Sequence, residues 1–533
     1  MEVEGIPFKK TGYFSDLICD YLEGKETLLP FYDRPPRIDQ FKEQIKAKQN
    51  FPETHRKVLY SVLKDQYKNV GISEDTKVNI SLLKEASTFT VVTGHQLNLF
   101  TGPLYFLYKI ISTINLTKEL KLSNPENNFV PIYWMATEDH DFDEINYFNF
   151  RGKKLQWNKK ASGAVGPLET DGLEAILEAF SNEMGNSINA NRLKAWFAKA
   201  YLEHDNLTDA TRFLANELFG EHGLVILDGN NAELKRLLLP YVKRDLLENA
   251  SFNKVIATID QLQALPENYG IQVNPREINY FYLVEGVRER ILERDGKYYI
   301  NDTKIQFSQE EILTELEKYP ERFSPNVITR PLYQEVILPN LCYIGGGGEL
   351  AYWLELKDMF EEMKVPFPIL LLRNSALVIT GKQMEKLHRM NISLTDIFLK
   401  QNSLINKKIR EISNIDIDFT PQKKHLEEQF KGLYELASQT DASFLGAVKA
   451  QEVKQLQGLD HLEKRLLKAQ KRKLEDHVMR MTEIQNQLFP NKSLQERNLN
   501  FSELYLEYGE RLIPRLMKAL RPLSGDFSIV KMD

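Results

Sequence analysis

The sequence predicts an α/β protein with a parallel sheet at its centre and a helical coiled coil towards its C-terminus. A strand, a helix and a second strand follow one another between residues 89 and 136, and this order generates parallel pairing. Short continuous apolar runs at 224–227 and 369–372 are typical of strands that are buried on both faces. The stretch from 425 to 488 lacks proline and has apolar residues at intervals of seven, which indicates a coiled coil.

Length and composition narrow the class of protein. A chain of 533 residues is too long for one simple core, so roughly two to four structural units are expected. The net charge of −6 argues against a nucleic-acid partner, which needs a concentrated basic surface. The two cysteines are far apart, which suggests a reducing compartment. No apolar run approaches the ~18 residues of a membrane span, so we expect a cytoplasmic protein with no membrane partner.

Apolar runs and turns define the first strand–helix–strand unit. A strand at Phe89–Thr93 is followed by a polar turn and then by a helix from about Pro103 to about Leu120. Proline is favoured in the first helical turn because its missing N–H would have no partner there. A second strand at about Val130–Ala136 leads directly into a charged loop. Because the two strands are expected to be parallel, their polar loops should lie at the same edge of the sheet.

The predicted core covers residues 1–380 and is interrupted by insertions at about 151–220 and 240–325. The first insertion carries helical segments, and the second includes an antiparallel piece that turns at Asp295-Gly296. Residues 381–500 are predicted to form the helical coiled-coil domain. We expect the aromatic-rich segment 501–533 to pack back on the core.

A repeat near the end of the helical domain carries the coiled-coil prediction. Apolar side chains recur every seven positions at Leu467, Leu474, Met481 and Leu488. This period predicts a helical hairpin or a coiled coil, and the alternative is a helix packed on its own domain. A coiled coil would join two copies of the chain as a homodimer.

Three groups of residues could carry chemistry, and the first follows the first strand. It comprises Thr93, Gly94, His95, Gln96 and Gly102. A loop between the carboxyl end of a strand and a helix is where open α/β sheets bind ligands, and helix N-termini favour anions. We therefore predict a phosphate site here, with His95 and Gln96 as donors. The alternative is a turn with a structural histidine.

The second group is the sequence TEDHDFDE, residues 137–144, directly after the second strand. Acids this close together repel one another unless a cation, a bound amine or solvation offsets their charge. Asp, His and Glu together suit several divalent ions, so a metal-dependent hydrolase or transferase using 137–144 is an alternative class of enzyme. The H-E-x-x-H spacing is absent, and no residue is assigned as a metal ligand.

The third group is the sequence GGGGELAYW, residues 345–353, which opens an amphipathic helix. Four successive glycines imply an unusual backbone conformation or the close approach of a ligand. The spacing matches neither a Walker A loop nor G-x-G-x-x-G, and a flexible linker is the alternative. Arg330 upstream and Arg373 downstream could bind carboxylate or phosphate through their guanidinium groups.

Taken together, these motifs resemble one known family. The sequences TGHQLNLFTGPLYFLYKI, VPIYWMATEDHDFDEI, GGGGELAYWLELKDMF and LLRNSA are similar to those of the bacillithiol biosynthesis cysteine-adding enzymes, and the resemblance covers the whole chain. It implies a Rossmann-like core similar to nucleotidyltransferases, inserted connecting subdomains and a dimerising coiled coil. The implied reaction joins the carboxyl group of L-cysteine to the amine of glucosaminyl malate. A non-enzymatic coiled-coil scaffold is the remaining alternative.

Amide formation from a carboxylate is uphill in water, so the expected co-substrate is ATP or another nucleotide, while a role for Mg²⁺ or Zn²⁺ is left open. The expected catalytic residues are His95, Asp139, His140 and Asp141. The expected nucleotide- and phosphate-binding residues are Thr93, Gly94, Gln96, Gly102, Gly345, Gly346, Gly347 and Gly348. The expected substrate-binding residues are Thr137, Glu138, Glu144, Arg330, Glu349, Tyr352, Trp353 and Arg373.

Overall fold

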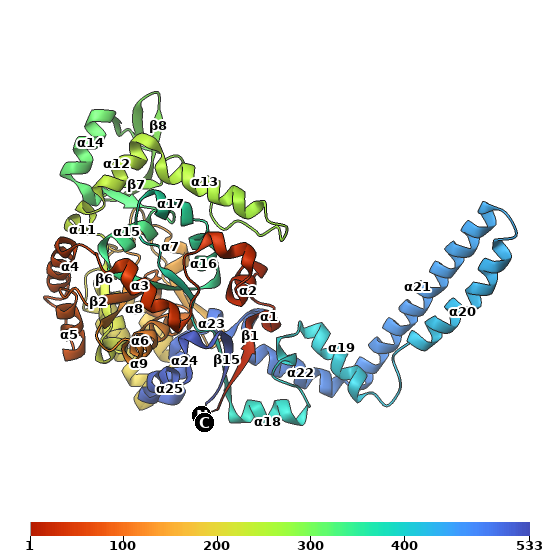
Figure 1. The fold of residues 1–533 in the computed structure, drawn as a ribbon. Coiled ribbons are helices and arrows are strands. Elements are labelled where there is room, and N and C mark those ends of the chain that lie inside the picture. The colour runs from red at the N-terminus through yellow and green to blue at the C-terminus, as the bar shows by residue number, and fades with distance from the viewer. Residues whose placement is uncertain (1, 533) are drawn as a thin grey trace. The chain divides into compact units, whose positions relative to one another are not determined.

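The computed structural model describes residues 2–532, which divide into two compact units. The first unit contains most of the chain up to Leu377 together with the later segment Ser493–Val530 (Figure 1). The second unit contains Val378–Lys492 and short pieces near both ends of the chain. In the described range, no helix combines the length and apolar character needed to cross a membrane.

A sheet of five parallel strands forms the centre of the first unit. The strand that comes first in sequence lies in the middle, the next two extend the sheet on one side, and the last two extend it on the other. This is the strand order of a Rossmann-like fold, so the predicted fold class is confirmed. In spatial order the strands are β13 (Ile369–Leu372), β12 (Asn340–Gly345), β2 (Thr88–His95), β3 (Asn128–Met135) and β6 (Val225–Asp228).

The predicted strands are confirmed, with different ends. β13 has the predicted bounds, whereas β2 continues through Gly94 and His95 because these residues pair with Trp134 and Met135 of β3. His95 is therefore the last residue of a strand and does not lie in a turn. The following helix, α6 (Tyr105–Ser123), begins two residues after Pro103, so the prediction that this proline occupies the first helical turn is wrong.

Helices pack against the sheet and bury its apolar side chains. Helix α6 packs on β2 and β3, and α3 (Phe41–Lys48) packs on β12. One core cluster joins residues of both helices to four of the strands: Phe41, Phe89, Val91, Leu116, Leu120, Phe129, Leu341, Cys342, Ile344, Ile369 and Leu371. This burial on both faces explains why the strands appear in the sequence as continuous apolar runs.

A second sheet of five strands lies in the region 280–325 and has the order β10-β9-β8-β7-β11. The turn predicted at Asp295-Gly296 is present, and both residues have positive φ angles. A further hairpin turn at Glu285-Gly286 joins the first two strands, so this piece is larger than predicted. The strands are β7 (Tyr280–Val284), β8 (Val287–Arg294), β9 (Lys297–Ile300), β10 (Gln306–Ser308) and β11 (Phe323–Pro325).

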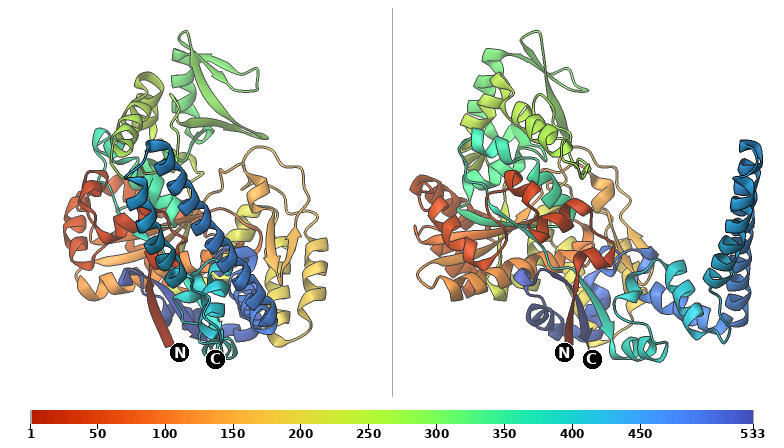
Figure 2. Two further views of the ribbon diagram at one scale, coloured as in Figure 1. Left: turned by 90° about the vertical axis from the view of Figure 1, so that its right-hand side faces the viewer. Right: turned by 45° about the vertical axis from the view of Figure 1, so that its right-hand side comes forward.

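Most of the remaining elements of the first unit surround these sheets or belong to smaller ones (Figure 2). Strands β4 (Tyr147–Phe150) and β5 (Lys153–Gln156) form a hairpin, and β1 (Glu2–Pro7), β15 (Asp526–Met532) and β14 (Ala376–Thr380) form a sheet in that order. The other helices outside the region 378–492 are α1 (Phe8–Thr11), α2 (Asp16–Glu23), α4 (Glu53–Gln66), α5 (Glu74–Leu82), α7 (Phe142–Ile145), α8 (Glu174–Met184), α9 (Ile188–Leu202), α10 (Leu207–Phe219), α11 (Ala232–Arg236), α12 (Leu239–Glu248), α13 (Ala250–Gln263), α14 (Gln309–Lys318), α15 (Arg330–Ile337), α16 (Gly347–Leu354), α17 (Lys357–Glu362), α23 (Gln495–Asn498), α24 (Phe501–Tyr508) and α25 (Leu512–Ala519).

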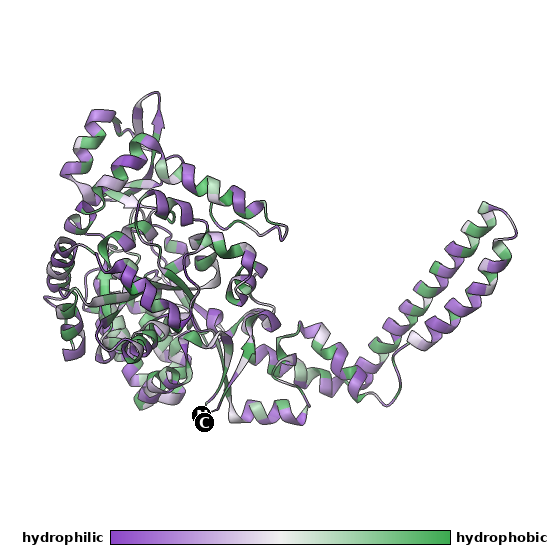
Figure 3. Ribbon diagram, viewed as in Figure 1, coloured by the Kyte–Doolittle hydropathy of each residue, from purple (hydrophilic) through white to green (hydrophobic). Residues whose placement is uncertain are grey.

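The second unit is helical and includes a long hairpin formed by α20 (Thr420–Ala437) and α21 (Ala442–Lys473). The two helices bury a small apolar seam that contains Phe430, Ala437 and Val448. Figure 3 shows apolar and polar turns alternating along both helices. The other helices of this unit are α18 (Gly381–Arg389), α19 (Gln401–Ile412) and α22 (Glu475–Leu488).

The seven-residue repeat lies outside the seam of this hairpin. Leu474 has φ −107° and ψ 33°, so it ends α21 and separates it from α22. Both α21 and α22 contact α19, and Leu467, Met481 and Leu488 are buried. The repeat therefore serves packing within its own unit, as the alternative interpretation held, and a different part of the region forms the predicted helical hairpin.

The loop between β2 and α6 has an uncommon backbone that a distant segment holds in place. Phe100, Thr101 and Gly102 all have positive φ angles. The side-chain amide of Asn500 donates hydrogen bonds to the carbonyl oxygens of Phe100 (2.8 Å) and Gly102 (2.7 Å). The backbone N–H of Phe100 donates to the Tyr201 hydroxyl (2.7 Å). Such strained conformations persist only when surrounding contacts fix them.

Substituting Gly102 with alanine is expected to lower the free energy of unfolding by about 3 kcal/mol. Gly102 has φ 62° and ψ −132°, which only glycine adopts without strain, and an added Cβ would lie 2.6 Å from Cβ of Asn98. Denaturant unfolding of the variant tests this expectation. The control is Gly71→Ala, because Gly71 has no positive φ and open space around its Cα; an equal effect of both substitutions would contradict the argument.

Candidate active site

The strand order of the parallel sheet reverses at one point, between β2 and β12, and we call this the switch point. The predicted site residues gather around it. β2 and β12 are neighbours, although they come first and fourth among the strands of this sheet. Connections from their carboxyl ends run to opposite sides, which leaves a crevice where open α/β sheets bind ligands. Gly94 and His95 end β2, and Gly345 ends β12.

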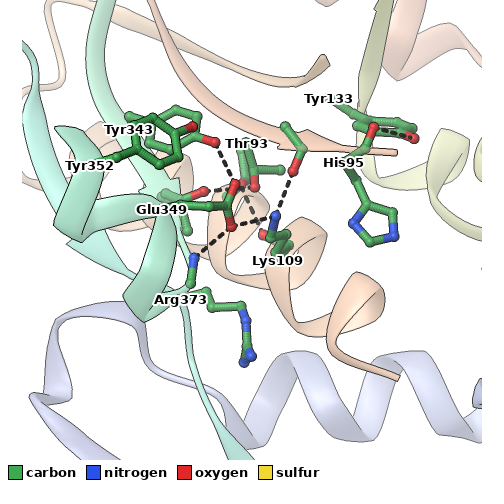
Figure 4. Close-up of polar contacts among 12 residues, drawn as sticks. Thr93, His95, Lys109, Tyr133, Tyr343, Glu349, Tyr352 and Arg373 are labelled. Atoms are coloured by element: carbon green, nitrogen blue, oxygen red, sulfur yellow. Dashed lines mark hydrogen bonds and ion pairs between the residues drawn. The ribbon is translucent and has the colours of Figure 1, made fainter. Parts of the chain in front are cut away.

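An ion pair spans this switch point (Figure 4). Nζ of Lys109 on α6 lies 2.7 Å from Oε2 of Glu349 on α16 and donates to the carbonyl oxygen of Gly94 at 2.6 Å. Glu349 also accepts hydrogen bonds from the Tyr343 hydroxyl (2.7 Å) and the Gly346 N–H (2.8 Å). The Lys109 side chain is only 5% exposed, so its charge depends on this carboxylate.

The electrostatics of the pair follow from burial and proximity. Burial lowers the pKa of Lys109, and the adjacent Glu349 only partly restores it. Burial would raise the pKa of Glu349, but Lys109 and the Gly346 N–H outweigh this effect and hold it below its usual value. Glu349 therefore stays ionised at neutral pH and favours the charged form of Lys109 at the strand ends.

The glycine run has an ordinary backbone. None of the four residues from Gly345 to Gly348 has a positive φ, so the prediction of an unusual conformation is wrong. A Cβ on Gly345 would lie 2.8 Å from Leu350 and 3.0 Å from Tyr343, which means that packing requires glycine there. Gly346 caps α16, and Gly347 and Gly348 form its first turn.

The two predicted arginines differ in how firmly they are held. Arg373 makes a buried ion pair with Glu496 (2.8 Å) and donates to the Ser375 hydroxyl (3.0 Å). Its Nε is buried and has no hydrogen-bond partner among residues 2–532. Arg330 donates to Gln334 (3.0 Å), and its guanidinium group lies 5.5 Å from the centroid of the Tyr343 ring. Both arginines keep donor capacity for an anion.

His95 is buried between aromatic rings. Its ring lies 5.6 Å from that of Tyr105 and 5.0 Å from that of Phe106, measured between centroids. Nε2 has no hydrogen-bond partner in the described part of the chain. Burial, with a smaller contribution from Lys109, lowers the pKa of His95 to about 3. The imidazole is therefore neutral at pH 7 and could donate one N–H to a ligand, but it carries no charge.

Because His95 is buried, we expect the stability of the folded protein to depend on pH. Below its usual pKa of about 6.5 the unfolded chain binds a proton that the folded chain does not, so stability falls by about 1.4 kcal/mol per pH unit towards pH 3. Relative to a His95→Asn variant, the protein should lose about 3 kcal/mol between pH 7 and pH 4. Urea unfolding at several pH values measures this difference. His461→Asn, at an exposed histidine of the second unit, is the control, and parallel curves for the protein and His95→Asn would contradict the prediction.

The acidic loop is neutralised by groups of the protein itself. Glu138 pairs with Lys235 of α11, and Asp139 accepts from Gln96 (2.8 Å) and from the His140 N–H (2.7 Å). Burial would raise the pKa of Asp139, but the hydrogen bonds from His140 and Gln96 lower it below its usual value. Asp139 therefore stays ionised and is a weak base at neutral pH.

Other members of the loop have structural partners. Thr137 donates to Asp228 (2.5 Å), and the side chain of Asp141 accepts from the Glu144 N–H (3.3 Å) at the start of α7. Nδ1 of His140 lies 2.7 Å from a guanidinium nitrogen of Arg288 on β8. In the described range, no three His, Cys, Asp or Glu side chains are placed so that they could hold a metal ion.

The structure brings together some of the predicted residues and separates others. Thr93 donates to the Ile344 carbonyl (2.7 Å) beneath the switch point, and the Tyr352 hydroxyl lies 3.5 Å from Arg330. Gln96, Gly102 and Glu144 line a cavity of about 340 Å³ beside the switch point. Trp353 is fully buried and stacks on Tyr343, so it belongs to the core and not to the surface of the site.

Three residues near the site were absent from the sequence prediction. Lys109 had a signal, because it is the one charge in the apolar stretch Tyr105–Ile114, and a lone charge there must be paired. Glu496 and Arg497 come from the segment after the helical unit, and no local pattern connects them with strands that lie more than a hundred residues earlier.

The first unit contains an open parallel sheet of Rossmann-like order with polar groups at its switch point. The second unit contains a helical hairpin. Together they define a class of two-part α/β protein. Residues 1–374 match the family model "Bacillithiol biosynthesis BshC, N-terminal Rossmann-like domain", and residues 376–532 match "Bacillithiol biosynthesis BshC, C-terminal coiled-coil domain". The chain belongs to the BshC family, which confirms the resemblance found in its motifs.

Relatives named "Putative cysteine ligase BshC" match over nearly their whole length. The protein from Christiangramia forsetii is 60% identical over 99% of this chain and 99% of its own. That from Flavobacterium johnsoniae is 57% identical over 99% and 100%, and that from Bacillus cereus is 28% identical over 100% of both chains. One solved structure, titled as a putative arginyl-tRNA synthetase from Campylobacter jejuni, covers 80% of this chain and 98% of its own at 11% identity, and its TM-score is 0.21.

Proposed function

We propose that this protein is a cysteine ligase that forms an amide bond between the carboxyl group of L-cysteine and the amine of glucosaminyl malate, after a nucleotide has activated the carboxyl group. Membership of the BshC family and the names of the relatives support a cysteine ligase. The observation that carries the proposal is the pair Lys109–Glu349, which keeps an ammonium group at the switch point of a Rossmann-like sheet.

Activation needs groups that stabilise the charge of a transferring phosphorus. Lys109 and the buried Nε of Arg373 lie at the ends of the central strands, and both can donate to phosphate oxygens. The first turn of α16 adds backbone N–H groups of Gly347 and Gly348, which favour an anion. This arrangement suits either an acyl-adenylate or an acyl-phosphate.

The acidic loop would bind the acceptor substrate. An ionised Asp139 with a low pKa is better suited to orient Gln96 or an ammonium group than to remove a proton. Glu144 accepts from the same Gln96 amide at 2.8 Å, so the two carboxylates and Gln96 form one polar wall next to His95. This wall would place the amine of glucosaminyl malate near the activated carboxyl group.

Incubating the purified protein with ATP, L-cysteine and glucosaminyl malate tests the proposal, with products followed by mass spectrometry. The expected product is the amide, accompanied by AMP if an adenylate forms or by ADP if an acyl-phosphate forms. Reactions without nucleotide are the control and should give no amide. Binding of both substrates without product would reject ATP as the activating nucleotide, and binding of neither would reject the ligase function.

We also propose that two copies of the chain associate through the α20–α21 hairpin. The hairpin exposes large apolar side chains that its own seam does not bury: Leu433, Leu436, Phe444, Leu445, Val453 and Leu462. Sedimentation should give the mass of a dimer for the protein and of a monomer for Leu436→Glu/Leu445→Glu. Lys431→Glu, an exposed change on the same helix, is the control. A double variant that remains dimeric would place the interface elsewhere.

A further inference from the structure

The cavity beside the switch point carries both signs of charge. Its volume of about 340 Å³ lies near the lower end of the range for pockets that bind small molecules. Glu144 and Gln96 line it together with Arg497. All of these residues belong to the first unit. A ligand that satisfies this lining must therefore offer an anionic group and also hydroxyl or ammonium groups.

Arg497 is the cation of this cavity, and it is free to bind an anion. It lies on the short helix α23, and its guanidinium group has no hydrogen-bond or ion-pair partner in the described part of the chain. The preceding residue, Glu496, is engaged by Arg373 at 2.8 Å and by the N–H of Ala376 at 3.0 Å. The Glu496 carboxylate is therefore already engaged, and it does not pair with Arg497.

Uncharged polar groups complete the lining. Oδ1 of Asn98 is buried and has no hydrogen-bond partner within residues 2–532, while its amide donates to the Glu144 carbonyl at 3.2 Å. Tyr105 and Tyr147 line the same cavity. Asn and Tyr side chains can donate to and accept from the hydroxyl groups of a sugar, and a carboxylate can accept from them.

Tyr105 connects the cavity with the proposed site of activation. Its ring lies 5.6 Å from the His95 ring and 4.9 Å from the Arg373 guanidinium group. A molecule held in the cavity would therefore lie next to the groups that end β2 and follow β13. The two substrates of a joining reaction need this proximity.

We propose that this cavity is the acceptor site of the ligase, in which Arg497 binds a carboxylate of the malate part and Glu144 with Gln96 binds the sugar. The ligand class is a small hydroxylated amine that carries carboxylates. This inference rests on the proposed function for the identity of the acceptor, and on the cavity alone for the role of Arg497. Arg497 is then a specificity-determining residue, because a sugar without the carboxylates would leave the Arg497 guanidinium group without a partner.

Isothermal titration with glucosaminyl malate, and separately with L-malate, tests the role of Arg497. In Arg497→Gln the Kd for glucosaminyl malate should rise about 10- to 100-fold, since a hydrogen-bonded charge contributes about 1.5–3 kcal/mol. Arg497→Lys should retain part of the affinity. Arg511→Gln, at an exposed arginine of the same segment, is the matched control. The Kd values for ATP and L-cysteine should be unchanged in all variants.

The outcomes separate this inference from the proposed function. If Arg497→Gln binds glucosaminyl malate as the unmodified protein does, or weakens ATP binding to the same extent, the inference is overturned. If the protein forms the amide and the KM for the acceptor is unchanged in Arg497→Gln, the function stands and the inference falls. If the acceptor binds through Arg497 but no amide forms with ATP, the inference stands and ATP is rejected as the activating nucleotide. Glu144→Gln gives a second measurement and should also raise the Kd.

Discussion

Replacing Lys109 with methionine is expected to lower the turnover of the proposed ligase reaction by about 10²- to 10³-fold, the usual effect of removing one preorganised donor from a developing charge. Methionine keeps the length of the side chain but removes the ammonium group that lies 2.7 Å from Glu349. The rate of amide formation under saturating substrates measures the effect. Lys118→Met, at an exposed lysine of the same helix, is the control and should change the rate less than about twofold.

A double variant separates catalysis by Lys109 from its structural role. Lys109→Met alone leaves the carboxylate of Glu349 without its cation, so the free energy of unfolding should fall. Lys109→Met/Glu349→Gln removes both charges and should recover much of that stability. Turnover should remain low in the double variant. Recovery of turnover together with stability would mean that the pair supports the fold only.

Lys48→Met is expected to lower the free energy of unfolding by about 3–5 kcal/mol, because it leaves a buried carboxylate without its cation. Lys48 and Glu335 lie 2.6 Å apart, and their side chains are 2% and 0% exposed. Glu335 also accepts hydrogen bonds from Asn340 (2.6 Å) and Gln334 (3.0 Å), which fixes its position. Denaturant unfolding of the first unit gives the measurement.

The molecule offers a matched control for this buried pair. Lys57 and Glu53 also lie 2.6 Å apart, but their side chains are 70% and 75% exposed. Lys57→Met should therefore cost less than about 0.5 kcal/mol, since water screens the pair. Similar losses for Lys48→Met and Lys57→Met would show that burial does not set the strength of these ion pairs.

The sequence predicted the strands better than it predicted their ends. The run Ile369–Leu372 was located without error because all four residues are apolar and buried. The end of β2 was placed before Gly94 because a change to polar residues usually marks the end of a strand. In the structure, pairing with β3 continues through His95. The seven-residue repeat correctly predicted a helical, coiled-coil domain, but it did not show which helices pair, since burial against α19 produces the same spacing of apolar residues as a coiled coil does.

The sequence predicted those residues of the candidate site that belong to local motifs. The groups after β2, β3 and β12 are visible because polar and glycine-rich sequences follow apolar runs. Lys109 was hidden within a helix that otherwise resembles a core element. Arg497 could not be found from the sequence, because its position in the cavity depends on the return of the chain after the helical unit.

The chain returns to the first unit after the helical unit has been made, so the order of synthesis affects how the first unit folds. The strained turn at Phe100–Gly102 is held by Asn500, which is 400 residues later than Phe100. A ribosome that makes about 5–20 residues per second has therefore released β2 for roughly 20–80 seconds before the residue that fixes its following turn exists. The helical unit can form during this interval, whereas the turn after β2 still lacks the residue that fixes it. Chaperone binding to nascent chains should accordingly concentrate on the sheet and end when residues 493–530 emerge.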